Sequence, residues 1–295
     1  MLARSEFKEE VLVAHFQSFW FGDVLPPCQT LCMKSFIDHG HEYDLYCYAS
    51  PVVPRGVRVL DANEILSRRE VFFYRRGRET GSVAGFANLF RYQLLAMRGG
   101  WWVDTDVLCL SSRIPEGETF LERENEDQIC NAVMKFPSGH SFVKALCEKS
   151  REAGQDLEWG QTGPRLVSEL AKQMGLWDQV EVQKHAYPIH WTEAYLPVTP
   201  SGRRAAYEKT QSAAFLHLWN EVFRLQGSVK LHNPPNGSLL AEIYKKHGVE
   251  RRRWVLAGDN EQEHGRNGTR IFTRQLLRRL RMMVRARTSR IRRFF

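Results

Sequence analysis

The stretch from residue 85 to residue 110, GFANLFRYQLLAMRGGWWVDTDVLCL, decides the fold. Residues 81–97 predict a helix, because apolar side chains recur at helical spacing and form one stripe. Gly99 and Gly100 are expected to end this helix. A strand with the sequence Trp-Trp-Val then begins at residue 101 and runs directly into Asp104-Thr105-Asp106. The expected core stripe consists of Phe86, Phe90, Leu94 and Met97.

The segment upstream alternates apolar runs with helix signals. Residues 11–20 (VLVAHFQSFW) are almost continuously apolar, which is typical of a strand that is buried on both faces. Strand–helix–strand alternation predicts an α/β fold with a central, mostly parallel sheet flanked by helices. The further elements expected are a helix from Pro26–Pro27 to Gly40, strands at 43–48 and 57–60, and a short helix capped by Asp61.

The downstream half is less regular. Helices are expected near 140–153 and 163–174, and irregular aromatic segments at 185–198 and 213–223. The stretch AGDNEQEHGRNG is polar and rich in Gly and Asn, and predicts a linker. We therefore expect one large folded domain at 1–256, a linker at 257–269 and a separate basic tail at 270–295.

Composition limits the class of protein. A chain of 295 residues with 43% apolar and 26% charged residues is an ordinary globular protein that can bury a large core. The sequence contains neither a secretory signal pattern at residues 1–10 nor a long uninterrupted apolar run. Its six cysteines form no CxxC pairs, so buried reduced thiols and a cytoplasmic location are expected.

Asp104 and Asp106 are the first candidates for chemistry. They follow a strand too apolar to lie at the surface, at the end of a strand where open α/β sheets bind ligands. Two neighbouring carboxylates that are buried need a compensating cation, and hard oxygen ligands suit Mg²⁺ or Mn²⁺. The alternative from spacing alone is a solvated loop at a strand end. The helix that precedes the strand places Asn88 and Arg91 on one face, where they could bind a hydroxyl and a phosphate.

The quoted stretch resembles the signature of DXD-type sugar transferases, the glycosyltransferase family 32 proteins. Their relatives include outer-chain mannosyltransferases, α-1,4-galactosyltransferases and glucosylating toxins. The signature consists of a small-Ser-Asp triplet, Arg-Tyr, a Leu-rich turn, Gly-Gly, an aromatic residue and Asp-x-Asp. This chain differs at the Ser-Asp pair, where Ala87 and Asn88 stand. The matching residues are Arg91, Tyr92, Gly99, Gly100, Asp104 and Asp106.

The resemblance implies a GT-A-like nucleotide-sugar-binding fold and further site residues. HFQSFWFGDVLPP is similar to the family's first strand and loop, and GQTGP to its loop near the reacting sugar. AAFLHLWN is similar to the segment in which a His completes the metal or diphosphate shell. A core strand, an ordinary turn and a core histidine remain the respective alternatives. The implied residues are Gln17, Ser18, Phe19, Trp20, Asn88, Arg91, Tyr92, Asp104, Thr162 and Asn220 for the nucleotide sugar, Asp104, Asp106 and His217 for the metal, and Asp104, Asp106 and Gln161 for catalysis.

These residues predict a metal-dependent, retaining hexosyltransferase that uses a UDP- or GDP-sugar donor and a glycan or lipid-linked glycan acceptor. Bacterial-type polysaccharide or lipopolysaccharide biosynthesis is the expected setting. The alternative is a binding module of the same fold without turnover. A metal-dependent nuclease would need a second cluster of acidic residues and histidines, which the sequence near the signature lacks.

The tail has a composition of its own. Residues 270–295 contain ten of the 42 basic residues and no acidic residue, so the rest of the chain is close to neutral. Arginines interleaved with apolar residues are typical of a helix that lies on an anionic membrane surface. We expect peripheral attachment to the cytoplasmic face of a membrane and no nucleic-acid binding. Nucleic-acid binding and a solvated tail are the alternatives.

Overall fold

A computed structural model describes residues 13–77, 79–224 and 231–251 of the chain. The expected linker at 257–269 and tail at 270–295 lie outside the described residues, and the boundary of the 1–256 domain stays a prediction. None of the helices in the described ranges is long and apolar enough to cross a membrane.

A seven-stranded sheet forms the centre of the molecule, with the strand order β3-β2-β1-β4-β7-β6-β8. The first four strands in this order run parallel, β7 is antiparallel to both of its neighbours, and β6 pairs in parallel with β8. Two further strands, β5 and β9, form a separate antiparallel pair. The strands are β1 (His15–Trp20), β2 (Glu42–Cys47), β3 (Val57–Asp61), β4 (Gly100–Val103), β5 (Val107–Cys109), β6 (Phe120–Asn125), β7 (Gln128–Phe136), β8 (Glu181–Val182) and β9 (Phe215–His217).

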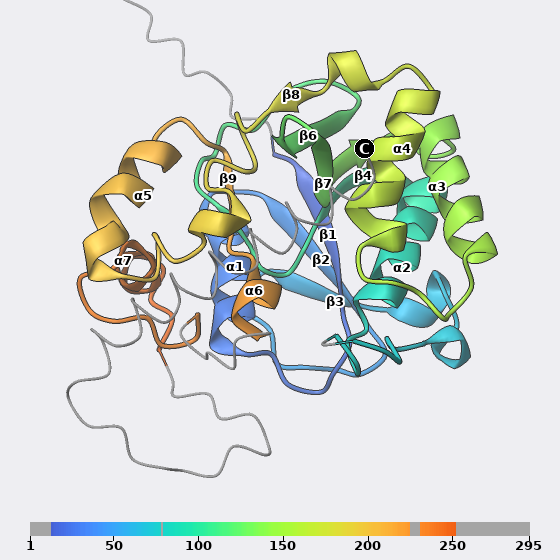
Figure 1. Ribbon diagram of the computed structural model, residues 1–295. Coiled ribbons are helices and arrows are strands. Elements are labelled where there is room, and N and C mark those ends of the chain that lie inside the picture. Colours follow the sequence, from blue (N-terminus) through green and yellow to red (C-terminus); the bar gives the residue numbers. More distant parts are fainter. Residues whose placement is uncertain (1–12, 78, 225–230, 252–295) are drawn as a thin grey trace, which may run out of the picture.

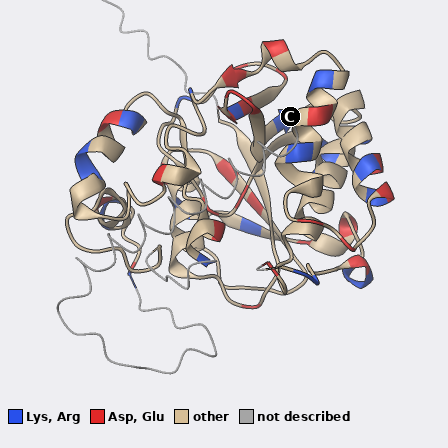
Figure 2. Cartoon of the chain, viewed as in Figure 1, with Lys and Arg blue, Asp and Glu red and all other residues tan. Residues whose placement is uncertain are grey.

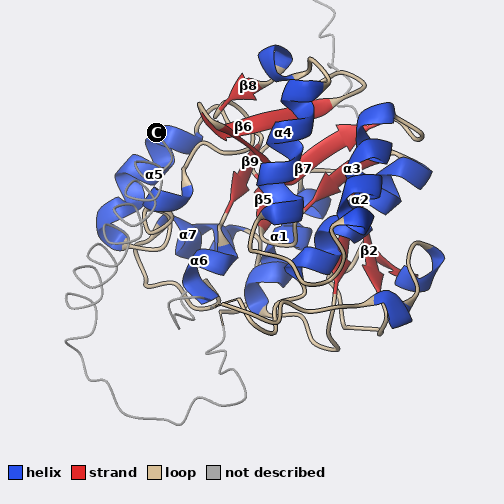
Figure 3. Ribbon diagram, turned by 45° about the vertical axis from the view of Figure 1, so that its right-hand side comes forward, coloured by secondary structure: helices blue, strands red, loops and turns tan. Residues whose placement is uncertain are grey.

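Helices cover both faces of the sheet (Figure 1). Helices α2, α3 and α4 lie together on one face, and α1 lies on the other, toward α5, α6 and α7 (Figure 3). The predicted α/β class, with a mostly parallel sheet flanked by helices, is confirmed. The helices are α1 (Pro27–Asp38), α2 (Ala84–Arg98), α3 (Ser141–Glu152), α4 (Leu166–Gln173), α5 (Arg203–Thr210), α6 (Asn220–Arg224) and α7 (Leu239–Lys246).

Each face of the sheet has its own apolar core. Strand side chains alternate between faces, so Phe16 packs against α1 and Phe19 packs against α2. Phe16 and Phe36 rings are 4.5 Å apart, and Phe19 stacks on Phe90 at 4.4 Å. All six cysteines are buried and free, as expected. Charged side chains of both signs mark outer helices such as α3 and α5 (Figure 2).

The junction between α2 and β4 requires glycine at residue 99. Gly99 ends the helix with a φ of +65°, a left-handed conformation that side chains disfavour. A Cβ there would lie 2.4 Å from the backbone nitrogen of Ser138, which leaves no room for any other residue. The helix stop predicted at this glycine is therefore confirmed, and it delivers β4 directly into the centre of the sheet.

Three local predictions differ from the structure. Met97 was expected in the core stripe of α2, but it is 48% exposed because it lies in the last turn, beyond the edge of the sheet packing. The helix expected from residue 163 begins at Leu166. The preceding turn, Gln161–Arg165, contains Pro164 and a non-helical Gly163. The segment 213–223, expected to be irregular, contains β9 and α6.

At the amino end of the parallel strands, Asp44 is a buried carboxylate with charged partners. Its oxygens accept hydrogen bonds from His15 Nε2 at 2.7 Å and from Arg58 Nε at 2.6 Å. Burial opposes ionisation of Asp44, but hydrogen bonds from His15 and Arg58 outweigh it and lower the pKa of this carboxyl. The carboxylate thus joins β1, β2 and β3 through ionic hydrogen bonds.

We expect Asp44→Asn to lower the free energy of unfolding at neutral pH by about 1 to 2 kcal/mol, allowing for solvent screening at the exposed Arg58. Because the folded pKa of Asp44 is lowered, its contribution is present above the unfolded pKa of about 4 and is lost as the pH falls through the folded value. Urea unfolding across this pH range should therefore show that the free energies of unfolding of the wild-type and Asp44→Asn proteins become similar in acid. The exposed Asp178→Asn is the control, and a difference that stays constant with pH would contradict the assignment.

Candidate functional site

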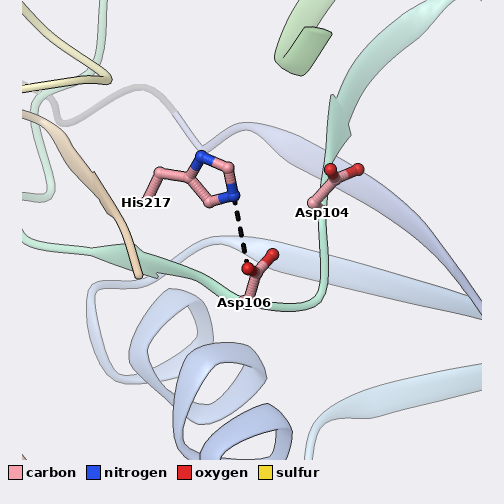
Figure 4. Close-up of side chains that lie close together, drawn as sticks. All are labelled: Asp104, Asp106 and His217. Carbon is pink, nitrogen blue, oxygen red and sulfur yellow. Dashed lines mark ion pairs between the residues drawn. The ribbon is translucent and has the colours of Figure 1, made fainter. Parts of the chain in front are cut away.

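Three potential metal ligands come together at the carboxyl end of β4. Asp104, Asp106 and His217 each offer a ligand atom, and these atoms lie within 4.8 Å of one another. Figure 4 shows the imidazole of His217 pointing toward Asp106, with Asp104 on the same turn of chain. The three side chains are 28%, 14% and 10% exposed, so the cluster is recessed yet reachable from solvent.

The backbone brings His217 to the acidic pair across the short β5–β9 ladder. Val107, directly after Asp106, pairs with His217 in this ladder. The backbone nitrogen of Leu218 donates to the carbonyl of Asp106 at 2.9 Å, which extends the pairing by one residue. A histidine 111 positions further along the chain is thereby fixed beside Asp106 by ordinary strand pairing.

Asp104 is held by two donors from the elements on either side of Gly99. Arg91 Nη2 of α2 and Trp102 Nε1 of β4 both donate to Asp104 Oδ1, the latter at 2.8 Å. Arg91 also lies over the Trp102 ring, 4.9 Å from its centre. Burial raises the pKa of Asp104, and Arg91 only partly offsets this effect. Both donors use Oδ1, which leaves Oδ2 as the oxygen not engaged by this pair.

Asp106 is held by a different type of partner. Its Oδ2 lies 3.3 Å from His217 Nε2 and accepts a hydrogen bond from the backbone nitrogen of Asn220 at 2.8 Å. Burial acts against ionisation, but His217 lowers the pKa of Asp106. Burial alone would lower the pKa of His217, and the Asp106 carboxylate instead raises it well above its ordinary value. The pair thus favours a protonated imidazole beside an ionised carboxylate.

The donor set fits a divalent cation. Two carboxylates and an imidazole within 4.8 Å provide hard oxygen ligands and one nitrogen, a set that suits an ion such as Mn²⁺. Two like charges this close in a recessed site repel each other unless positive charge lies between them. The cluster could therefore hold a metal ion. Among the described residues it is the single group of three or more His, Cys, Asp and Glu ligands that meets this distance.

Four predicted residues belong to a buried hydrogen-bonded network beside the cluster. Arg91 Nη1 donates to the carbonyl of Asn131 on β7 at 2.6 Å. The side chain of Asn131 contacts both Asn88 and Tyr92, and Tyr92 in turn contacts Thr162. The structure thus brings together Asn88, Arg91, Tyr92 and the turn at Thr162. Their role in binding a sugar stays a prediction.

Asn131 and Trp102 are contacts that the sequence reasoning missed. Trp102 stands two residues before Asp104, and residues i and i+2 of a strand point to the same face, so this contact had a local signal. Asn131 is the polar residue within the fully buried part, residues 129–134, of the strand QICNAVMKF. An isolated Asn in a buried strand indicates a hydrogen-bonded role, but its partners come from α2, 39 and 43 positions away.

Of the two residues predicted from the GQTGP turn, Thr162 is buried and Gln161 caps its own turn. Gln161 Oε1 accepts from the backbone nitrogen of Glu158 at 2.9 Å. Thr162 is 1% exposed, and its Oγ1 has no hydrogen-bond partner in the described part of the chain. Thr162 therefore has unused capacity for a ligand, and its turn is joined to the network by Tyr92.

The first strand contributes less than expected. Gln17 donates to the carbonyl of Gly99 at 2.8 Å and lines a pocket of about 370 Å³ at the amino end of the strands, away from the acidic pair. Ser18 is fully buried between Tyr43 and the carbonyl of Val103, and Phe19 stacks on Phe90. Only Trp20 stands at the carboxyl end of the strand, and its buried Nε1 lacks a partner in the described ranges. The structure therefore groups Trp20, not the other three, with the site end of the sheet.

A curated protein of known activity is similar to part of this chain. The chain is 23% identical over 191 residues to the human α-1,4-N-acetylglucosaminyltransferase. This match covers 60% of the chain, which spans only 54% of the length of that curated relative. The resemblance to sugar transferases is confirmed. The α/β sheet described above agrees with the fold class that this resemblance implies. No family model matches the chain.

Solved structures give weaker likenesses. The PaToxG glycosyltransferase is 8% identical with a TM-score of 0.41, over 80% of this chain and 84% of that one. The glycosyltransferase GlyE of Streptococcus pneumoniae is 12% identical with a TM-score of 0.38, over 83% of this chain and 66% of that one. We draw nothing further from likenesses this distant.

We expect Mn²⁺ to bind the cluster of Asp104, Asp106 and His217 more tightly as the pH rises. The raised pKa of His217 means that a proton must leave the imidazole before it can coordinate a cation. Loss of one proton on binding gives an affinity that rises by up to about tenfold per pH unit between about pH 6 and pH 8. Calorimetric titration with Mn²⁺ would measure this slope. His217→Gln should flatten it while the control His185→Gln keeps it, and an unchanged slope in His217→Gln would exclude His217 as a ligand.

Proposed function

We propose that the protein is a metal-dependent, retaining glycosyltransferase that moves a hexose from a nucleotide diphosphate sugar to a glycan or glycolipid acceptor. The observation that carries the proposal is the Asp104–Asp106–His217 cluster, with Arg91 bound to one of its carboxylates. The name of the human relative, an α-1,4-N-acetylglucosaminyltransferase, supports the same class of reaction.

The chemical demand of sugar transfer is the negative charge that develops on the departing nucleoside diphosphate. Asp104, Asp106 and His217 would hold a divalent cation, Mn²⁺ or Mg²⁺, which would supply Lewis-acid stabilisation of that charge. Arg91 positions Asp104, and its buried Nε has no hydrogen-bond partner among the described residues. This free donor adds a charge-assisted hydrogen bond for a phosphate or ribose oxygen.

Retention of configuration is proposed to follow a front-side path. Asp104 is paired with Arg91 and Asp106 with His217, and both carboxylates are assigned to the cation, so neither is assigned as a covalent nucleophile. The acceptor hydroxyl oxygen therefore forms its bond to the anomeric carbon on the side from which the phosphate oxygen leaves. The hydroxyl proton passes to that departing phosphate oxygen. A glycosylated Asp or Glu trapped on the protein would contradict this path.

We expect wild-type protein with Mn²⁺ to hydrolyse at least one member of a panel of UDP- and GDP-sugars slowly. Asp106→Ala should reduce this rate by about 10² to 10³-fold, because one charge-stabilising group at the diphosphate is lost. Asp178→Ala, which removes an exposed carboxylate, is the matched control and should leave the rate unchanged. A wild-type protein that binds these donors but turns none over is instead a nucleotide-sugar or glycan-binding module.

We further propose that the acceptor is glycan or lipid-linked glycan in bacterial-type polysaccharide or lipopolysaccharide biosynthesis. Attachment through residues 270–295 to the anionic cytoplasmic face of a membrane would bring the site to such an acceptor. This part of the proposal rests on the sequence of the segment alone, in which ten arginines alternate with apolar residues.

Removal of residues 270–295 should release the protein from vesicles that contain anionic lipid. Each Arg near such a surface contributes about 1 kcal/mol, so loss of the segment should weaken co-sedimentation with phosphatidylglycerol vesicles by more than tenfold. Neutral phosphatidylcholine vesicles are the control for charge dependence. Equal sedimentation of the full and shortened chains would remove the membrane from the proposal.

A further inference from the structure

Trp159 stands directly before the turn that is joined to the network beside the acidic pair. Tyr92 Oη donates to the carbonyl of Thr162 at 2.8 Å, which ties this turn to α2 next to Arg91. Thr162 is buried, whereas the side chain of Trp159 is only partly buried. A large aromatic side chain thus stays in part accessible to solvent, close to the residues that are predicted to bind the sugar.

The backbone holds Trp159 in a tight turn at residues 158–161. The backbone nitrogen of Gln161 donates to the carbonyl of Glu158 at 3.1 Å, and the backbone nitrogen of Glu158 donates to Gln161 Oε1 at 2.9 Å. Gly160 has φ and ψ of +75° and 0°, the values of the third residue of a type II turn, where glycine is favoured. Trp159 is the second residue of this turn, so two hydrogen bonds that close the turn fix its backbone.

Tyr74 supports the indole of Trp159 and joins it to α2. The centres of the two rings are 5.3 Å apart, with their planes inclined at 47°. Tyr74 packs against the first turn of α2, where a Cβ on Gly85 would lie 3.3 Å from Tyr74 Cζ. The missing side chain of Gly85 therefore allows Tyr74 to approach the helix closely. Tyr74 thus fixes Trp159 relative to the helix that carries Asn88 and Arg91.

The same pair of rings lies near α6. Burial raises the pKa of Tyr74 to about 12, and the carboxylate of Glu221 acts in the same direction. Glu221 belongs to α6, and the first residue of this helix, Asn220, donates through its backbone nitrogen to Asp106. Tyr74 and Trp159 are therefore close to both helices that bind the acidic pair, α2 and α6.

From this placement we infer that Trp159 is a stacking platform for a pyranose ring of the acceptor glycan. The inference rests on the proposed function and assigns one subsite of the acceptor. A pyranose has a face of C–H groups, which an aromatic ring can cover while the hydroxyl groups keep their hydrogen bonds. Trp159 has a fixed backbone and a ring supported by Tyr74. Gln161 is then a positioning residue, because its side chain closes the turn that presents Trp159.

An ion pair in the same segment suits the hydroxyl groups of a neutral sugar. Arg165 Nη1 lies 3.5 Å from Glu158 Oε2, and the two side chains are 53% and 79% exposed. A guanidinium donates and a carboxylate accepts, so the pair can bind neighbouring hydroxyls, each of which is both a donor and an acceptor. The two charges compensate each other, which favours a neutral pyranose over a charged one.

The direct test is fluorine NMR of protein that carries fluorinated tryptophan, with Mn²⁺ and UDP or GDP present. Trp159→Phe identifies the signal of Trp159 by its loss. Titration with the methyl pyranosides of glucose, galactose, mannose and N-acetylglucosamine should shift this signal with at least one of them. The signal of Trp177, which is also partly buried but follows the far end of α4, should stay unchanged.

A second readout is the ratio of sugar transfer to hydrolysis, with the methyl pyranoside that shifts the Trp159 signal most as the acceptor. Trp159→Ala should lower this ratio by at least about tenfold, because the stacking face is lost. Loss of folded protein slows both reactions alike and cancels in the ratio. Trp159→Phe keeps an aromatic ring and should restore most of the ratio. Gln161→Ala should lower the ratio less, and the control Trp177→Ala should keep it.

A Trp159 signal that none of these pyranosides shifts would overturn the inference, as would a shift by methyl glucuronide alone or an unchanged ratio in Trp159→Ala. In these cases hydrolysis of a nucleotide sugar by the wild-type protein leaves the proposed function standing. Wild-type protein that hydrolyses no UDP- or GDP-sugar overturns the proposed function instead, and a shifted Trp159 signal would then still support a glycan-binding site at this residue.

Discussion

Charge compensation of two neighbouring carboxylates is the constraint on which the rest of the site depends. Asp104 and Asp106 meet this constraint in different ways. Arg91 compensates Asp104 with its guanidinium, whereas His217 compensates Asp106 with an imidazole whose proton can leave. A cation that enters would therefore replace the proton on His217 while the Arg91 pair stays in place. Both carboxylates thus have a positively charged partner, and the cluster could still hold a cation.

The fold supports this arrangement by making β4 the boundary between two kinds of pairing. On one side β4 runs parallel to β1, and on the other it runs antiparallel to β7. The parallel side brings α2 and Arg91 over the sheet, and the antiparallel side brings Asn131 under Arg91. Gly99 makes the boundary possible, because it allows the chain to leave α2 and enter the sheet within two residues.

The sequence predicts the features that depend on near neighbours. The α2–β4 block follows from helical periodicity, paired glycines and an apolar strand. The structure agrees apart from Met97 and from the start of the helix, which begins at Ala84 and not at residue 81. The sequence is less informative about features that depend on which face of a strand a residue occupies, or on partners that are distant in the chain. Gln17 and Ser18 stand in the right strand, but one hydrogen-bonds Gly99 and the other lies inside the sheet. Motif likeness identifies a strand and does not show which residues stand at its carboxyl end.

The backbone beside Asp106 and His217 is strained at one residue, which contacts with residues distant in the sequence hold in place. Trp219 has a φ of +55°, a conformation that costs a bulky residue about 1 to 3 kcal/mol. Its indole donates to the carbonyl of Ile189 at 2.8 Å, and its ring lies 4.0 Å from that of His217. The strained residue reverses the chain so that the next backbone nitrogen, of Asn220, can donate to Asp106. The strained backbone at Trp219 therefore precedes a neutral backbone donor to Asp106, beside the charged partner His217.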